Sequence, residues 1–272
     1  MSVIKIENLV RNYGNGKGIC NVSFHVNQGE AFGFLGPNGA GKTTTIRHLM
    51  GFLKPESGTC TINGLDCWND RDQVQAVLGY IPGEISFFDD MSGTEYLNFI
   101  AEYRKTGPQN RKEELLERFE LDPRGRIKKM SKGMKQKLGI VAAFMHDPDI
   151  LILDEPTSGL DPLMQSRFVQ FVSQEKERGK TILMSSHMFE EVERTCDRIG
   201  IIRNGRMIAV DSAAALHDRH TRSYTVTLEN ETAAQAFAAD FGGRCSGTKV
   251  TVTARQSLEE VFMNYYGGEK HD

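Results

Sequence analysis

The sequence predicts an α/β protein whose mainly parallel sheet follows an N-terminal antiparallel β subdomain, with an inserted helical subdomain and a small C-terminal α+β extension. Three patterns support this. Apolar and polar residues alternate in the first thirty positions, as along half-buried antiparallel strands. Apolar runs then alternate with helical stretches, which is typical of a parallel α/β sheet. Between these runs, residues 93–147 have apolar side chains at helical spacing, which predicts the helical subdomain.

The composition is that of an ordinary globular protein. The 272 residues are 39% hydrophobic and 25% charged, with a formal net charge of -3, so the chain does not have the basic balance of a nucleic-acid-binding protein. No run reaches the about 18 apolar residues of a membrane span, and Met1 to Val10 do not resemble a signal peptide. The five cysteines are scattered and form no metal-binding pattern. We therefore expect a cytoplasmic protein with reduced thiols and no nucleic-acid partner.

The elements follow one another in a regular order. In the antiparallel subdomain, Val22, Phe24 and Val26 are expected on one face of a strand. Asn204-Gly205, between two apolar runs, predicts a hairpin. The remaining strands and helices are expected at Ala31 to Leu35 (strand), Lys42 to Met50 (helix), Ile150 to Leu153 (strand), Met164 to Glu177 (helix), Thr181 to Ser185 (strand) and Met188 to Cys196 (helix).

The main domain is expected to span residues 1–215 and the extension residues 222–272. In the extension the same patterns predict two strands and two helices. The strands are expected near Tyr224 to Leu228 and Lys249 to Thr253, and the helices near Thr232 to Phe241 and Leu258 to Tyr265.

A glycine-rich segment matches the phosphate-loop pattern GxxxxGK[ST] and lies between an apolar strand and a helix, the context that the motif requires. Its backbone amides and the start of the helix suit phosphate oxygens. Lys42 is expected to reach the β- and γ-phosphates, and the Thr43 hydroxyl to bind Mg²⁺. The expected nucleotide contacts here are Gly36, Pro37, Asn38, Gly39, Ala40, Gly41, Lys42, Thr43 and Thr44. The sequence thus predicts a P-loop NTPase core that binds a nucleotide together with Mg²⁺.

Two carboxylates end a later buried strand. Asp154 is placed to hold Mg²⁺ and Glu155 to polarise the attacking water, although an acidic residue at this place could instead cap a helix. The phosphate loop upstream favours the catalytic interpretation. His187 follows the next apolar strand and could contact a γ-phosphate, whereas a single histidine at a strand end is more often structural.

The motifs together resemble those of the ABC ATPases. The resemblance covers about residues 3–210, and its middle elements distinguish it from other P-loop proteins. The ordered set is Lys42-Thr43, Met130-Ser131-Lys132-Gly133-Met134, Leu153-Asp154-Glu155, Ser158-Gly159-Leu160-Asp161 and His187.

The resemblance implies a head-to-tail dimer, of two identical or two related chains, with two ATPs between them. In such a dimer Ser131 and Gly133 of the signature segment bind the γ-phosphate held by the other chain, and Asp161 lies at the dimer seam. Tyr13 matches the aromatic residue that stacks on adenine, with a buried or turn-side tyrosine as the alternative. The same resemblance implies that His187 contacts the γ-phosphate.

The sequence departs from the family pattern at two places. Lys132 and Met134 replace a glycine and the glutamine of the usual signature, and the resulting run resembles the branch that exports drugs, peptides, lipids or polysaccharides. Gly83 occupies the position of the glutamine that contacts Mg²⁺ and water, and Glu84 is a candidate Mg²⁺ ligand one position later.

The resemblance implies an ATPase that drives export through a separate integral membrane permease, to which the chain binds at the inner face of the membrane. Phe87, Phe88 and Met91 lie where this family receives the permease, and core packing is the alternative. The alternative function is a non-transport ABC ATPase acting on a soluble macromolecular partner.

Overall fold

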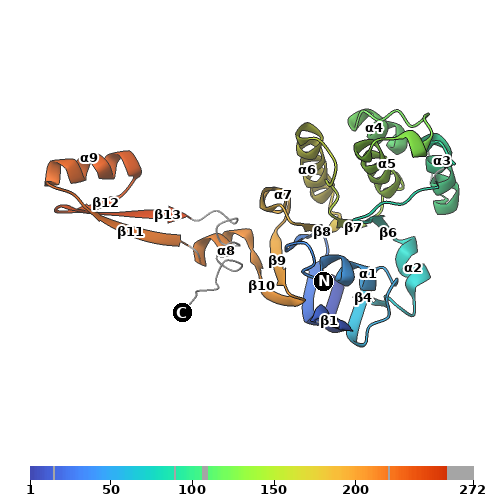
Figure 1. Ribbon diagram of the computed structural model, residues 1–272, viewed down its shortest axis with the longest axis horizontal. Helices are drawn as coiled ribbons and strands as arrows, with labels where there is room; N and C mark the ends of the chain where they lie inside the picture. The colour runs from blue at the N-terminus through green and yellow to red at the C-terminus, as the bar shows by residue number, and fades with distance from the viewer. Residues whose placement is uncertain (15, 89, 106–109, 220, 256–272) are drawn as a thin grey trace. The chain divides into compact units, whose positions relative to one another are not determined.

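The computed structural model describes residues 1–14, 16–88, 90–105, 110–219 and 221–255, and it divides the chain into two compact units. The first is Met1–Val210 and the second Asp211–Asp272. Figure 1 traces both from the blue N-terminus to the orange C-terminal elements. Each unit is described by itself.

The first unit begins with an antiparallel sheet. Its strands are β1 (Ser2–Gly14), β2 (Lys17–Asn27), β4 (Ser57–Ile62) and β5 (Leu65–Asp66), in the order β2-β1-β4-β5. The N-terminal antiparallel subdomain is confirmed, but the patterns did not predict β4 and β5. The available signal was Asn63-Gly64, two residues with positive φ (51° and 79°) between Ile62 and Leu65, as in a tight two-residue hairpin.

A six-stranded sheet forms the centre of this unit. Its strands are β3 (Ala31–Leu35), β6 (Leu78–Ile81), β7 (Ile150–Asp154), β8 (Thr181–Ser186), β9 (Arg198–Arg203) and β10 (Arg206–Ser212), in the order β10-β9-β3-β8-β7-β6. The pairs of β3 with β8 and β9, and of β7 with β6 and β8, are parallel. The carboxyl ends of β3, β7 and β8 therefore meet at one edge, where ligands of such sheets bind.

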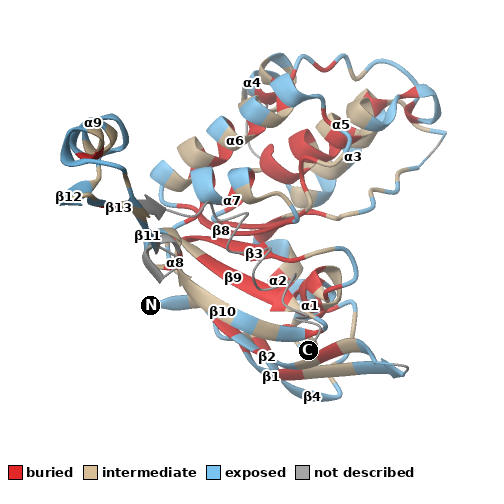
Figure 2. Ribbon diagram, turned by 60° about the vertical axis from the view of Figure 1, so that its left-hand side comes forward, coloured by how far each residue is buried: buried red, intermediate tan, exposed pale blue. Residues whose placement is uncertain are grey.

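Helices cover the two faces of the sheet differently. In Figure 2, α5 (Lys132–Phe144), α6 (Pro162–Glu177) and α7 (Phe189–Thr195) lie on one side of β3 and β8. The helix α1 (Lys42–Leu49) lies on the other side, together with the antiparallel sheet. Three further helices are α2 (Arg71–Ala76), α3 (Gly93–Arg104) and α4 (Asn110–Arg118), with a 3₁₀ turn at Ile127–Lys129. The predicted helices that follow β3, β7 and β8 are confirmed, and so is the α/β fold class.

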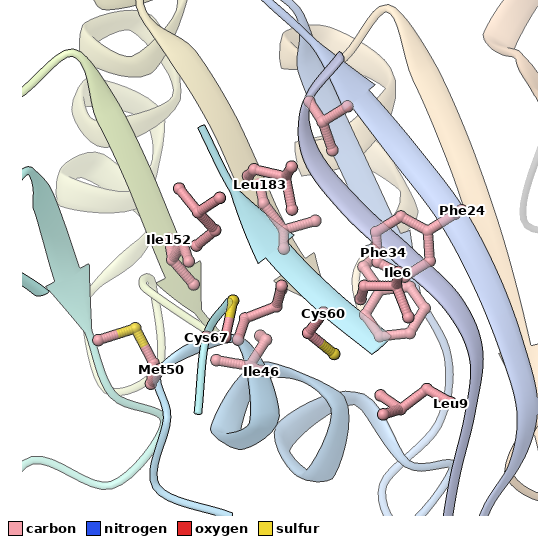
Figure 3. Close-up of a cluster of buried hydrophobic side chains, with 14 of the residues drawn as sticks. Ile6, Leu9, Phe24, Phe34, Ile46, Met50, Cys60, Cys67, Ile152 and Leu183 are labelled. Carbon is pink, nitrogen blue, oxygen red and sulfur yellow. The ribbon is translucent and has the colours of Figure 1, made fainter. Parts of the chain in front are cut away.

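The main hydrophobic core fills the space between the two sheets and around α1. Figure 3 shows Phe24 and Phe34 from the two sheets beside each other, with ring centres 5.1 Å apart. Ile46 of α1 and Ile152 of β7 are fully buried in the same cluster. This core fixes the start of α1 relative to the ends of β3 and β7, and so fixes the phosphate loop relative to the carboxylates.

The second unit contains α8 (Ala213–Arg219), β11 (Thr221–Thr227), α9 (Glu231–Phe241), β12 (Arg244–Ser246) and β13 (Lys249–Arg255), with the strands in the order β11-β13-β12. The two predicted strands and the first predicted helix are present. The patterns did not predict α8 or β12. The helix expected at Leu258 to Tyr265 lies outside the described residues.

Candidate nucleotide and hydrolysis site

The phosphate loop connects β3 to α1 through a backbone that glycine makes possible. Gly39 and Gly41 have φ of +80° and +112°, a region that other residues rarely adopt. The Lys42 side chain is buried, and its ammonium donates to the carbonyl oxygens of Gly36 (2.6 Å) and Pro37 (3.2 Å). The lysine is therefore folded back against the inside of the loop.

A cavity of about 400 Å³ opens in front of this loop, a size that suits a small-molecule ligand. The cavity is lined by the loop together with Glu155 and Tyr13, which are distant from the loop in sequence. Its lining consists of Tyr13, Lys17, Gly18, Pro37, Asn38, Gly39, Gly41, Lys42, Thr43, Thr44 and Glu155. Gly36 and Ala40 belong to the loop but not to the lining, and a side chain at position 36 would meet Ile202 O at 2.6 Å.

Asp154 ends β7 with a fully buried carboxylate. Its Oδ1 accepts a hydrogen bond from Ser185 Oγ (2.5 Å), and the Thr43 hydroxyl group lies near enough to the carboxylate to lower its pKa. Its Oδ2 is buried without a hydrogen-bond partner. Burial raises the pKa of Asp154, against the opposing effect of the two hydroxyl groups.

The residues around Asp154 suit a magnesium ion. An orphaned carboxylate oxygen beside a threonine hydroxyl is a set of hard oxygen ligands, which Mg²⁺ prefers. Gly83 lies close by, since a Cβ at this position would be 3.1 Å from Asp154 Oδ2. The side chain of Glu84 is exposed, so its role as a magnesium ligand stays a prediction.

Glu155 lies between a cation and an imidazole. Its Oε1 is 3.1 Å from Lys42 Nζ, and its Oε2 is 3.1 Å from His187 Nδ1. The backbone of Glu155 has a φ of 47°, which is uncommon for a residue other than glycine, and its amide donates to Ser185 Oγ (3.1 Å). The structure thus brings together Lys42, Glu155 and His187, the three residues that the sequence offered for catalysis.

Tyr13 lies at the rim of the cavity and is half exposed. The guanidinium of Arg11 lies 5.3 Å from the centre of its ring. The side chain is thus not part of the core, and one face of a ring at the rim could stack on a base. Its contact with adenine stays a prediction.

The residues that the resemblance assigns to the contact with a second chain lie at the starts of α5 and α6. Ser131 caps α5 by accepting from Met134 N (3.2 Å), and Asp161 caps α6 by accepting from Met164 N (3.0 Å). Gly133 packs close to Gly159, whose carbonyl oxygen would be 3.0 Å from a Cβ at position 133. None of these three predicted residues lines the cavity of the phosphate loop in the described part of the chain.

Sequence reasoning missed Ser185 and Ser186, the last two residues of β8. Ser185 links the Asp154 side chain to the backbone of the next residue, because its hydroxyl donates to the Asp154 carboxylate and accepts from the Glu155 amide. Ser186 lies on the other side of the strand and donates to Glu191 (2.8 Å). Two hydroxyl side chains at the carboxyl end of an otherwise apolar strand were the signal that could have revealed them.

Comparisons with known proteins identify the family. The sequence pattern of the family described as "ABC transporter" matches residues 19–158. The linearmycin resistance ATP-binding protein LnrL of Bacillus subtilis (strain 168) is 38% identical over 222 residues, which cover 80% of this chain and 71% of that protein. The chain belongs to the ABC transporter family.

Two further relatives agree with this assignment. The bacitracin transport ATP-binding protein BcrA of Bacillus licheniformis is 39% identical over 210 residues, covering 76% of this chain and 69% of that protein. A solved structure described as the ATP-binding subunit of an ABC transporter is 31% identical, with a TM-score of 0.73, and the match covers 80% of this chain and 93% of that one. The chain is thus an ABC transporter ATP-binding subunit that binds and hydrolyses ATP.

Three further features of this ABC transporter subunit concern its cysteines, its metal-binding side chains and its helices within the described residues. All five cysteines are free, and burial raises the pKa of the Cys60 and Cys196 thiols to about 12. Among the described residues, no group of three or more histidine, cysteine or acidic side chains is arranged to hold a metal ion. No helix within the described ranges is long and apolar enough to cross a bilayer.

Asp154→Asn is expected to raise thermal stability in the absence of nucleotide. The folded state raises the pKa of this carboxyl group, so it binds the proton more tightly than the unfolded state does. The charged form therefore destabilises the fold, and stability falls as the pH rises through the raised pKa. The amide removes this cost, and each kcal/mol gained shifts the melting temperature by roughly 2–4 °C.

Thermal unfolding at neutral pH, with and without Mg-ATP, checks this expectation. Mg-ATP should stabilise the wild-type protein more than Asp154→Asn. Asp161→Asn is the matched control: helix amides lower the pKa of Asp161, so its charge stabilises the fold and its removal should give no gain. A lower melting temperature for Asp154→Asn than for the wild type would contradict the burial argument.

Proposed function

We propose that this chain drives export through a separate membrane permease, as one of two ATPase subunits that share two ATP sites. The observation that carries the proposal is the position of Glu155 between Lys42 and His187 at the cavity of the phosphate loop. The names of the relatives, which refer to linearmycin resistance and bacitracin transport, support export of a drug or peptide. In this proposal the permease selects the cargo and holds the chain at the inner face of the membrane.

Each residue of the site has a role in hydrolysis. The loop amides and the start of α1 hold the phosphates, and Lys42 turns from its carbonyl partners toward the β- and γ-phosphates. Glu155 accepts a proton from the attacking water, and His187 orients Glu155 and contacts the γ-phosphate. Tyr13 stacks on the adenine at the rim of the cavity.

Magnesium would be held by Thr43 and Asp154, where it would neutralise charge on the β- and γ-phosphates. The buried Asp154 Oδ2 is the oxygen free to take this position. Ser185 keeps the other oxygen of the carboxylate in place by donating to Oδ1. The protein thus orients the carboxylate before any ligand binds.

The arrangement within one chain favours a dimer. Ser131 and Gly133 stand at the exposed start of α5, where backbone amides and a hydroxyl group are available to a phosphate, yet they do not line the cavity of their own chain. Asp161 is exposed at the start of α6. A second chain, identical or related, would bring these residues to the γ-phosphate from the other side and complete the site.

A second cavity is suited to the permease. It has a volume of about 230 Å³ and is lined by residues of α3, α5 and the segments around β6, among them Tyr80, Phe87 and Tyr103. Phe88 is 57% exposed and packs edge-on against Phe99 of α3 at 6.0 Å. Exposed aromatic side chains beside a groove with aromatic walls are typical anchors for a partner, here a helix of the permease.

Phe88→Ser is expected to weaken association with the permease by at least about 10-fold, because anchors of this kind carry much of a binding energy. Its melting temperature should stay near that of the wild type because the ring is mostly exposed. Phe87→Ser should instead lower stability, since Phe87 is partly buried against Tyr96, with ring centres 4.9 Å apart.

The measurement is co-purification of the tagged chain with its permease from native membranes, together with thermal unfolding. Phe241→Ser, at an aromatic position of similar exposure (61%) in the second unit, is the control and should retain the permease. Full retention of the permease by Phe88→Ser would show that the exposed Phe88 side chain is not part of the docking surface. That result would not affect the roles proposed for Lys42, Glu155 and His187 in ATP hydrolysis.

A further inference from the structure

The loop that carries His187 is tied to α7 by a buried hydrogen-bond relay. Ser186 Oγ accepts from the Met188 amide (2.9 Å) and donates to Glu191 Oε2 (2.8 Å). Both Ser186 and Glu191 are buried, with 2% and 4% of their surface exposed. The bond from the Met188 amide to Ser186 spans His187, whose own side chain is half exposed.

Glu191 is itself held on a rigid support. Its carbonyl oxygen accepts from Thr195 Oγ1 (2.6 Å), one turn further along α7. The helix lies directly against β3: a Cβ at Gly33 would be 2.0 Å from Val192 Cγ1. Because β3 leads into the phosphate loop, α7 and Glu191 are fixed relative to that loop.

The orientation of the His187 ring depends on how firmly its loop is held against α7. Its ring reaches Glu155 Oε2 through a single contact of 3.1 Å, from a loop between β8 and α7. A displacement of about 1 Å is enough to cost a catalytic contact much of its effect. A loop residue with a half-exposed side chain has few neighbours to prevent such a displacement.

We propose that Ser186 and Glu191 are positioning residues that hold His187 against Glu155. Ser186 fixes the backbone on both sides of the histidine, and Glu191 fixes the Ser186 hydroxyl so that its lone pair faces the Met188 amide. The Oε1 of Glu191 is buried and has no hydrogen-bond partner. Burying a carboxylate with one oxygen unpaired is costly for the fold, and a role in orienting the site accounts for it. The inference rests on the proposed role of His187.

The first test is turnover with Mg-ATP. Ser186→Ala and Glu191→Leu should each lower kcat by about 10-fold or more with little change in the KM for ATP. Ser186→Thr and Glu191→Gln keep the hydroxyl donor and the acceptor oxygen, so they should recover most of the lost turnover. Glu190→Leu, at an exposed neighbouring position, is the matched control and should behave like the wild type.

A double-mutant cycle separates positioning from stability. If Ser186 acts through His187, Ser186→Ala should cost turnover in the wild-type background but almost none in the His187→Ala background. An equal loss in both backgrounds would overturn the inference. Near wild-type turnover of His187→Ala alone would instead remove the proposed role of the histidine, and the inference with it.

A readout without turnover covers the case in which His187→Ala is too slow to measure. The ring resonances of His187 in the NMR spectrum of the full chain are assigned by their loss in His187→Ala. They should shift in Ser186→Ala and Glu191→Leu and return toward the wild-type position in Ser186→Thr. Unchanged resonances in Ser186→Ala would contradict a positioning role even if its turnover falls.

Discussion

Glu155→Gln is expected to lower ATP turnover by about 10²- to 10⁴-fold, the loss typical of a removed general base, while Mg-ATP still binds. The glutamine fills the same space but cannot accept a proton from water. Binding should survive because the phosphate loop is unchanged. Lys42 also retains its two carbonyl partners in the loop when the ion pair with position 155 is lost.

Phosphate release under saturating Mg-ATP measures the first effect and equilibrium nucleotide binding the second. Light scattering adds an independent observation, because trapped ATP should hold two variant chains together as a dimer only when ATP is present. Glu190→Gln is an exposed control that should hydrolyse ATP normally. Turnover of Glu155→Gln close to the wild-type value would remove Glu155 as the base.

Lys42→Ala and Ser131→Arg are each expected to be inactive, for reasons that lie on opposite sides of one shared site. The first removes the buried cation at the phosphate loop, and the second obstructs the exposed start of α5. Ser131→Arg also removes a helix cap, at a cost of about 1 kcal/mol. Ser131→Thr keeps both the cap and the hydroxyl group, and it should remain active.

Mixing the two inactive variants should restore activity. In a mixed dimer one site combines an intact loop with an intact signature, and the other site combines both defects. Because roughly half of the dimers are mixed at equal mixing and each has one intact site, at most roughly a quarter of the wild-type activity returns. Recovery above the sum of the separate variants is the expected result. Wild-type turnover by either variant alone would contradict its assignment to the shared site.

The carboxyl end of the parallel sheet was predictable because its signals are local. Lys42 and Thr43 follow a glycine-rich loop, and Asp154 and Glu155 end an apolar strand, so short runs of sequence suffice to find them. The fold then supplies the distances, because neighbouring parallel strands end at the same edge. Resemblance to a family was needed for His187, whose loop has no distinctive local pattern.

The features that the sequence could not reveal depend on contacts between distant elements. Ser185 matters because the order of the strands places β8 beside β7, and a hydroxyl there reaches both the Asp154 carboxylate and the Glu155 backbone amide. Phe87 and Phe88 are identical neighbours in the sequence. Only the packing of α3 separates the partly buried ring from the exposed one. Strand β4 begins with exposed residues and lacks a clear alternation of apolar side chains, so its turn was a better signal than its pattern.

The dependence of wild-type specific activity on protein concentration tests the shared site most directly. A monomer presents its phosphate loop without the Ser131 and Gly133 groups of a second chain, so the γ-phosphate lacks the donors that these groups would supply. Phosphate release per chain should therefore rise with concentration below the dimer dissociation constant and level off above it. Full activity that stays flat on dilution, from a chain shown by light scattering to be monomeric with ATP bound, would contradict the shared-site account.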